Sequence, residues 1–233
     1  PKSYVRAMEE DERGFTPETW EKIAGLGWLG LALPEKYGGG GGGFLDLCVL
    51  LEEMGRALLP GPFFSTVLLG ACTLLEAGSE EQKKEILPRV ARGERIMTLA
   101  LTEPSATWEA KGVQLKAKAK GADYILDGTK LFVPDAHVAD DIIVVARTGR
   151  GAKPENGVSL FLVSGKAPGI THTVLKTIAS DKQCEVVFDG VAVPARNMVG
   201  ALNKGWPVVE KTLQRAAVAK CAEMVGGAQR LLE

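Results

Sequence analysis

The spacing of the apolar residues changes near Met97, and this change constrains the fold more than any other feature of the chain. Before it, apolar residues recur at helical spacing, as at Trp20, Ile23 and Ala24. After it, residues 113–120 alternate apolar side chains with glutamine and lysine, which is the period of a half-buried strand. The chain therefore combines a helical first part with a strand-rich second part.

The stretch Leu99–Glu109 lies at this junction. It opens with a short apolar run typical of a buried strand and breaks at Glu103-Pro104, because proline has no N–H to continue a sheet. A strand that ends in a polar turn exposes backbone donors and small side chains, and such a place suits a polar ligand. A purely structural turn is the commoner explanation of this pattern.

Several helix signals precede Met97. Thr16-Pro17-Glu18 combines a hydroxyl cap, a proline at the first helical position and an acid in the first turn. Ser79 with Gln82 resembles a capping box, and we expect that helix to end at Leu87, before a proline. The strongly apolar segment 63–75 suits a core helix.

The second part contains many short apolar runs separated by turn signals. Asp127-Gly128 and Asp189-Gly190 are both typical of turns. Such spacing favours an antiparallel barrel or sandwich. After Trp206 the pattern is helical again and rich in alanine, which suits a helical bundle.

These signals predict an α+β multidomain fold. We expect an N-terminal helical domain at residues 1–97, a middle antiparallel β-barrel or sandwich domain at 98–206, and the first helix of a truncated C-terminal helical domain at 207–233. The chain begins without methionine and ends within a helical pattern, so we expect further residues on both sides.

Composition excludes some classes of protein. The formal net charge of -1 offers no basic surplus for nucleic acid, and no apolar run reaches the length of a membrane span. No signal-peptide pattern begins the chain. The cysteines are too far apart for a CxxC motif, and His137 and His172 have no ligand-spaced partners, so we expect no metal site. Reduced, buried thiols favour a cytoplasmic location.

Six glycines follow Tyr37 and raise the question of a phosphate-binding loop. They lack the GxxxxGK[ST] pattern, because no Lys-Ser or Lys-Thr pair follows. A flexible turn is the favoured interpretation.

Six short motifs, in order along nearly the whole chain, resemble those of the acyl-CoA dehydrogenase family. They are Leu33-Pro-Glu-Lys-Tyr-Gly-Gly39, Leu51-Glu-Glu-Met-Gly-Arg56, Gly78-Ser-Glu-Glu-Gln-Lys-Lys84, Leu101-Thr-Glu-Pro104, Asp127-Gly-Thr-Lys130 and Phe188-Asp-Gly-Val-Ala-Val-Pro194. The fourth is the most recognisable of them.

The resemblance implies an FAD-dependent enzyme of lipid metabolism that desaturates an acyl-CoA thioester. A carboxylate takes the α-proton, the β-hydrogen leaves as hydride to the flavin N5, and hydrogen bonds polarise the thioester carbonyl. In most members the base lies further along, beyond residue 233 here. The catalytic residue therefore stays unassigned, and a structural role is favoured for Glu223 over that of a base.

The resemblance also implies which residues hold the cofactor. Two segments are expected to lie against the isoalloxazine ring of FAD, and they carry Leu99, Leu101 and Thr102, then Phe132, Val133 and Pro134. The hydroxyl and backbone of Thr102 suit hydrogen bonds to the pyrimidine edge.

The chain departs from the family at two places. Ser105-Ala-Thr-Trp-Glu109 replaces the usual Gly-Ala-Gly-Ser-Asp, so Trp108 stands where a serine helps to bind the FAD pyrophosphate or CoA. We assign Trp108 to substrate binding, where it stacks on a ligand or blocks it. Pro134 replaces a hydroxyl residue near flavin N5 and removes both a hydroxyl and an N–H.

Three hypotheses follow. The first is an acyl-CoA dehydrogenase that acts as a homodimer or homotetramer and passes electrons to an electron-transfer flavoprotein. The second is a flavin-deficient, non-catalytic subunit that forms a heteromer with an active paralogue, and Trp108 and Pro134 favour it. The third keeps the fold but reacts with oxygen, as a flavin oxidase or monooxygenase.

Overall fold

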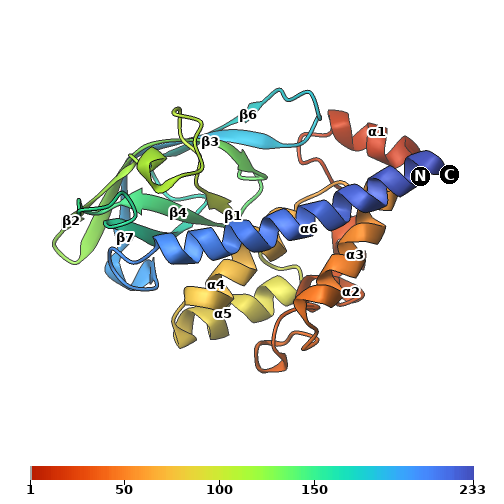
Figure 1. Cartoon of the computed structure of the whole chain (residues 1–233), viewed down its shortest axis with the longest axis horizontal. Helices are drawn as coiled ribbons and strands as arrows, with labels where there is room; N and C mark the ends of the chain where they lie inside the picture. The colour runs from red at the N-terminus through yellow and green to blue at the C-terminus, as the bar shows by residue number, and fades with distance from the viewer. Residues whose placement is uncertain (1) are drawn as a thin grey trace.

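The computed structural model describes residues 2–233, in which a layer of helices packs against one side of a large β-sheet (Figure 1). The helical elements are α1 (Lys2–Glu10), α2 (Pro17–Gly25), α3 (Phe44–Ala57), the π-helix η3 (Ser65–Ala71), α4 (Cys72–Ala77), α5 (Glu80–Ala91) and α6 (Trp206–Leu232), with 3-10 turns η1 (Trp28–Gly30), η2 (Glu35–Tyr37), η4 (Ala110–Gly112) and η5 (Ala195–Asn197). The order of helices, sheet and final long helix confirms the predicted fold class.

Capping hydrogen bonds are present at both predicted helix starts. The Thr16 hydroxyl accepts the N–H of Thr19 at 3.3 Å and caps α2. Ser79 and Gln82 cap α5 reciprocally: the Ser79 hydroxyl accepts the Gln82 N–H at 3.2 Å, and the Gln82 side chain accepts the Ser79 N–H at 2.9 Å. The local sequence therefore decides where these helices begin.

The expected end of α5 at Leu87 is wrong, because the helix continues through Pro88 to Ala91. A proline inside a helix removes one N–H and disfavours the helix. Here Leu87 and Val90 are both fully buried in the core between helices and sheet. Burial of this face outweighs the loss, and the N–H of Arg92 donates to the Pro88 carbonyl at 3.2 Å to close the last turn.

The glycine run forms a turn whose backbone is tied down. The N–H groups of Gly40, Gly41 and Gly42 donate to the carbonyls of Gly30, Leu33 and Leu31 at 2.9, 2.9 and 2.8 Å. The turn was expected, whereas these bonds to a segment ten residues earlier were not.

The strands form one eight-stranded sheet. They are β1 (Met97–Ala100), β2 (Lys116–Lys120), β3 (Asp123–Pro134), β4 (Asp141–Arg147), β5 (Val158–Ser164), β6 (Ile170–Leu175), β7 (Gln183–Pro194) and β8 (Met198–Val199). The order is β6-β7-β3-β2-β4-β5-β8, with β1 beside β4. Most pairs are antiparallel as expected, but β1 and β2 both pair with β4 in parallel.

Both Asp-Gly pairs lie inside long strands rather than at hairpin turns, so that expectation is wrong. β3 and β7 pair with each other, and Leu126 and Gly128 lie opposite Val191 and Phe188. Two residues of β7 thus face one residue of β3, which is a β-bulge. The N–H of Gly190, with φ 61°, donates to the Asp127 carboxylate at 2.9 Å across this bulge.

The middle of the sheet is buried on both faces. Ile143 and Val145 of β4 face the helices, whereas Ile142, Val144 and Ala146 face the core enclosed by the sheet itself. Every one of these side chains is fully buried. A strand that is apolar on both faces reads as a continuous hydrophobic run, which is the pattern of residues 142–146.

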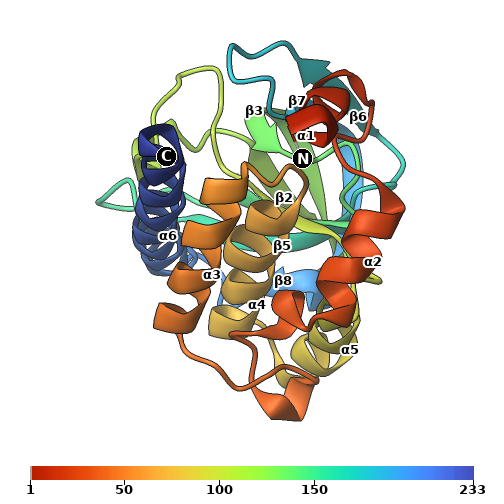
Figure 2. The ribbon, with the colours of Figure 1, turned by 90° about the vertical axis from the view of Figure 1, so that its right-hand side faces the viewer.

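Helix α6 lies along α3 and α4 (Figures 1 and 2). A Cβ at Gly226 would overlap the carbonyl oxygen of Glu52, and one at Gly55 would overlap the carbonyl oxygen of Glu223. The two backbones therefore approach more closely than larger residues would permit. By contrast, the nearest atom to a Cβ at Gly227 is the Gly55 carbonyl oxygen at 3.7 Å.

We predict opposite effects of alanine at the two neighbouring glycines of α6. Gly226→Ala forces α3 and α6 apart and lowers the free energy of unfolding by about 1–3 kcal/mol. Gly227→Ala has room for its methyl group and raises the free energy of unfolding by roughly 0.5–1 kcal/mol through helix propensity. Urea denaturation of both variants measures these changes in the free energy of unfolding. Equal effects of the two substitutions would contradict the close approach of α3 and α6 at Gly226.

Candidate functional site

The two segments expected to hold a cofactor lie side by side. The chain that leaves β1 runs beside the end of β3, where the Leu131 N–H donates to the Thr102 carbonyl at 2.8 Å. Further back, the Thr98 hydroxyl donates to the Pro134 carbonyl at 2.7 Å. Residues some thirty positions apart in the chain are thereby brought together as the sequence interpretation requires.

The six predicted cofactor residues divide by where their side chains lie. Leu99 and Leu101 are buried in the core toward the helices, and Val133 is buried in the core enclosed by the sheet. These three side chains anchor the backbone of the site to the two cores that lie under it. The residues at the surface are Thr102, Phe132 and Pro134, which we call the surface strip.

A second β-bulge turns Phe132 outward. Lys130 pairs with Val186 and Val133 pairs with Cys184, so two residues of β3 lie opposite one residue of β7. Phe132 has a φ of 52°, in the left-handed region that a bulky residue rarely adopts, and its side chain is 52% exposed. Bulges and backbone strain of this kind concentrate at ligand sites, where they aim a side chain.

A buried ion pair joins the two segments. The Lys130 ammonium is 0% exposed and donates to the Glu103 carboxylate at 2.7 Å and to the Leu101 carbonyl at 2.9 Å. The same carboxylate accepts the N–H groups of Gln114 and Leu115 at 2.9–3.0 Å. Burial lowers the pKa of Lys130 to about 8 against the attraction of Glu103, so the lysine remains charged at neutral pH.

Sequence reasoning missed this pair, although it quoted both motifs that supply it. Glu103 comes from Leu-Thr-Glu-Pro and Lys130 from Asp-Gly-Thr-Lys. The available signal was a charged residue close to a short apolar run in each motif, Glu103 after residues 99–101 and Lys130 before residues 131–133. Charged side chains are almost never fully buried unless they are paired.

Trp108 lies in a different setting. Its side chain is 71% exposed on the loop between β1 and β2. With Trp206, Glu210 and Leu213 of α6, it lines a hollow of about 370 Å³, which we call the tryptophan hollow. An exposed indole on the rim of a hollow suits stacking on a ligand, which is one of the two roles expected of it.

Asp135 follows the surface strip and ties it to the helices. Its carboxylate accepts the Ser65 hydroxyl of the π-helix at 2.5 Å, and its N–H donates to the Lys182 carbonyl at 2.8 Å. Burial raises the pKa of Asp135 to about 6, and the hydrogen bond from Ser65 opposes this rise. Nothing in the sequence pattern singled out this residue.

The surface strip offers hydrogen-bond donors at one edge. Within residues 2–233, neither the N–H nor the hydroxyl of Thr102 donates to another protein group. Phe132 adds an aromatic face, while Pro134 has no N–H to offer. Among the same residues no cluster of three or more His, Cys, Asp or Glu could hold a metal ion. The strip therefore fits a planar, polar-edged aromatic group better than a metal.

Comparisons with known proteins identify the family of the chain. The family model for the acyl-CoA dehydrogenase N-terminal domain matches residues 2–94, and that for the middle domain matches residues 98–191. A curated relative, the probable acyl-CoA dehydrogenase YngJ of Bacillus subtilis, is 34% identical over 97% of this chain and 61% of its own.

Solved structures of the same family share the fold. The "Tcur3481-Tcur3483 steroid ACAD" matches at a TM-score of 0.88 and 31% identity, over 98% of this chain and 59% of that chain. The ChsE4-ChsE5 complex of Mycobacterium tuberculosis matches at a TM-score of 0.86 and 28% identity, over 99% of this chain and 59% of that chain.

The chain belongs to the acyl-CoA dehydrogenase family, whose members are flavoprotein oxidoreductases. It spans between about half and three fifths of the length of the relatives it matches. No helix within residues 2–233 is both long enough and apolar enough to cross a membrane.

We predict that removing one partner of the buried pair destabilises the fold more than removing one partner of an exposed ion pair. Lys130→Met leaves the Glu103 carboxylate buried without its cation and lowers the free energy of unfolding by about 3–5 kcal/mol. Lys211→Met breaks the pair with Glu76, in which the lysine is 47% exposed, and costs less than about 1 kcal/mol. Chemical denaturation measures the free energy of unfolding of both variants. Equal losses in the two would contradict the interpretation of Glu103 and Lys130 as a buried ion pair.

We predict a pH dependence of stability that comes from Asp135. Between the usual pKa of about 4 and the folded value of about 6, the folded protein retains a proton that the unfolded chain releases. Stability from this residue is therefore present at low pH and lost as pH rises through about 4–6. Asp135→Asn keeps an acceptor for Ser65 but cannot ionise.

The free energy of unfolding of this variant, relative to the wild type, should rise by on the order of 2 kcal/mol between pH 4 and pH 7.5. Asp141, whose pKa burial also raises to about 6, is present in both proteins and cancels in the difference. Parallel pH profiles for the variant and the wild type would rule out this role for Asp135.

Proposed function

We propose that this chain forms the N-terminal and β-domain part of an FAD-dependent acyl-CoA dehydrogenase. The reaction is the α,β-desaturation of an acyl-CoA thioester with hydride transfer to the flavin N5. The observation that carries the proposal is the surface strip, in which Thr102, Phe132 and Pro134 come together from two segments. Family membership supports it, and the full activity requires residues beyond this chain.

Each residue of the strip has a role in this proposal. The free N–H and hydroxyl of Thr102 hold the polar edge of the ring system, and Phe132 packs against an aromatic face. FAD supplies the redox chemistry when it is bound. The buried leucines beneath the strip and the Glu103–Lys130 pair fix its backbone, so the donors are oriented before a ligand arrives.

The substrate is placed by the loop after β1. Trp108 and the start of α6 line one hollow, and the CoA part of the thioester passes through it in this proposal. The base that removes the α-proton lies outside residues 1–233. The acceptor of the electrons is an electron-transfer flavoprotein, and the protein acts as a homodimer or homotetramer.

A second candidate is a flavin-deficient subunit that forms a heteromer with an active paralogue. Pro134 favours it, because that position has neither an N–H nor a hydroxyl for the flavin. Trp108 favours it too, because a large ring replaces a serine of the family pattern. One solved relative, ChsE4-ChsE5 of Mycobacterium tuberculosis, is a complex of two proteins.

Titration of the full-length protein with FAD tests the proposal. We expect FAD uptake, and we expect Thr102→Val to weaken it by roughly tenfold, because the hydroxyl is lost while the shape is kept. Thr173→Val, an exposed threonine on β6, is the matched control and should change nothing. A wild-type protein that takes up no FAD would refute the proposed enzymatic function. It would favour the flavin-deficient subunit instead.

A further inference from the structure

Helix α6 and the end of the surface strip are linked through the start of the π-helix η3. The Lys220 ammonium of α6 lies 4.1 Å from the centre of the Phe64 ring. The next residue, Ser65, donates its hydroxyl to the carboxylate of Asp135, which directly follows the surface strip. Lys220 and Asp135 therefore approach one place from a helix and from the end of a strand. We call Phe64, Ser65, Asp135, Lys220 and Glu223 the polar cluster.

The charges of the polar cluster act on one another. Burial raises the pKa of Asp135 to about 6, the hydrogen bond from Ser65 lowers it, the charge of Asp181 raises it and the charge of Lys220 lowers it. Lys220 also pairs with Glu223 one turn further along α6, and both of these side chains are partly exposed. Such an exposed pair adds little to the stability of the fold. Its charges remain accessible to a ligand that lies over them.

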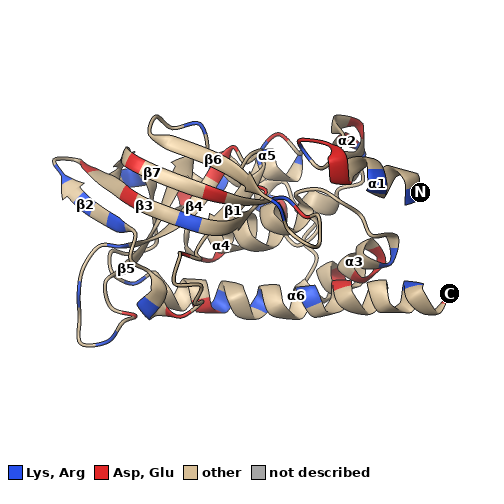
Figure 3. Cartoon of the chain, turned by 90° about the horizontal axis from the view of Figure 1, so that it is seen from above, with Lys and Arg blue, Asp and Glu red and all other residues tan. Residues whose placement is uncertain are grey.

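One face of α6 leads from the tryptophan hollow to the polar cluster. Leu213 lines that hollow, and Lys220 lies on the same face two turns, or about 10 Å, further along the helix. Between them Ala217 is exposed on this face and carries only a methyl group. The blue segments of α6 in Figure 3 mark the cations spaced along this helix. An extended ligand that enters by the tryptophan hollow therefore reaches Lys220 along an unobstructed helix face.

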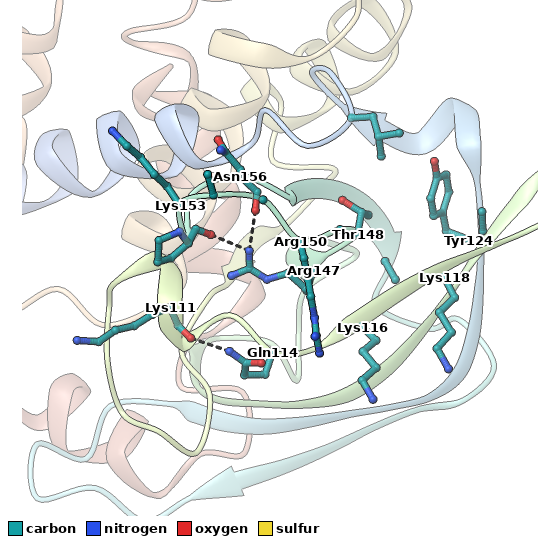
Figure 4. Close-up of a pocket in the computed structure, with 17 residues that line it drawn as sticks. Lys111, Gln114, Lys116, Lys118, Tyr124, Arg147, Thr148, Arg150, Lys153 and Asn156 are labelled. Carbon is teal, nitrogen blue, oxygen red and sulfur yellow. Dashed lines mark hydrogen bonds between the residues drawn. The ribbon is translucent and has the colours of Figure 1, made fainter.

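The cations of β2 gather in a different place. Lys116 and Lys118 line a hollow of about 940 Å³ together with Arg150 and Lys153, which come from the loop between β4 and β5 (Figure 4). Among the described residues that line this hollow, none comes from α6. The polar cluster is therefore separate from it.

The polar cluster offers a ligand both an acceptor and donors. Within residues 2–233, the second oxygen of the Asp135 carboxylate accepts no hydrogen bond. The Lys220 ammonium has three N–H donors, and its bond to Glu223 occupies one of them. A hydroxyl group suits such a cluster because it both donates and accepts.

Other ends of an acyl chain fit less well. A plain alkyl end would cover the ammonium and the carboxylates without replacing their hydrogen bonds to water, which costs free energy. A carboxylate end would meet two carboxylates, those of Asp135 and Glu223, against the single cation Lys220.

We propose that the polar cluster selects acyl groups that carry a hydroxyl on the part of the chain far from the thioester, with Asp135 and Lys220 as the residues that contact this hydroxyl. The inference rests on the proposed function, in which the thioester enters by the tryptophan hollow and lies along the surface strip. It narrows the substrate from acyl-CoA thioesters in general to hydroxylated ones.

Binding of paired CoA thioethers to the full-length protein, measured by calorimetry, tests this selection without turnover. S-alkyl-CoA and S-(ω-hydroxyalkyl)-CoA of equal chain length are compared over a series of lengths. Thioethers lack the carbonyl that makes the α-proton acidic, so they bind but are not desaturated. At the best length we expect the hydroxylated member to bind roughly tenfold more tightly than its alkyl partner.

Variants assign this preference to the polar cluster. Lys220→Met should weaken the preference for the hydroxylated thioether, and Asp135→Asn/Lys220→Met should reduce it to about twofold or less. The matched control is Lys211→Met, because that lysine also lies on α6, pairs with a glutamate and is 47% exposed, against 48% for Lys220. It should retain the wild-type preference. Equal melting temperatures verify that the substituted proteins fold.

The outcomes separate this selection from the proposed function. Equal binding of the two thioethers at every length, or a preference that the double variant retains, would overturn the selection. A dehydrogenase that acyl-CoA thioesters bleach, but whose thioether series shows no preference, would refute the selection alone. A hydroxyl preference in a protein whose flavin no thioester bleaches supports the polar cluster and counts against dehydrogenation. Binding of no thioether at all would contradict both.

Discussion

The ion pair between Glu103 and Lys130 holds together the part of the molecule on which the proposed activity depends. Both charges are almost fully removed from water, and the carboxylate also accepts two backbone N–H groups from the residues just before β2. It thereby joins the chain after β1, the beginning of β2 and the middle of β3 at one point. Desolvation of such a pair is costly, so its value lies in fixing one arrangement of three segments.

The surface strip follows from that arrangement. Leu99 and Leu101 are drawn into the core toward the helices, and Val133 into the core of the sheet, which leaves the backbone between them with little freedom. The bulge at Phe132 then presents an aromatic ring at the surface. The packing of the buried neighbours offsets the backbone strain at Phe132. A fold can keep a site preorganised in this way.

The sequence predicted those features that depend on neighbouring residues. The caps at Thr16 and Ser79 each result from residues a few positions apart, and both are present. The predicted alternation holds for residues 113–118, but Ala119 is exposed. The Asp-Gly pairs were misjudged because the same two residues suit a hairpin turn and a bulge, and only the partner strand decides between them.

The remaining features are long-range. Pro88 lies within a helix because the apolar face of that helix is buried against the sheet, and nothing local reports this. The pairing of Glu103 with Lys130 and the gathering of β2 lysines with Arg150 and Lys153 likewise depend on topology. The cofactor residues were named from motif resemblance, and the structure places them together; their contact with FAD stays a prediction.

The most direct test of the central claim is the visible absorbance spectrum of the full-length protein, recorded without oxygen before and after a panel of acyl-CoA thioesters is added. The account predicts a flavin spectrum that bleaches with at least one thioester, because the surface strip holds a flavin beside the substrate. A protein that binds flavin but is bleached by none of the thioesters would contradict the assignment of the strip to acyl-CoA dehydrogenation.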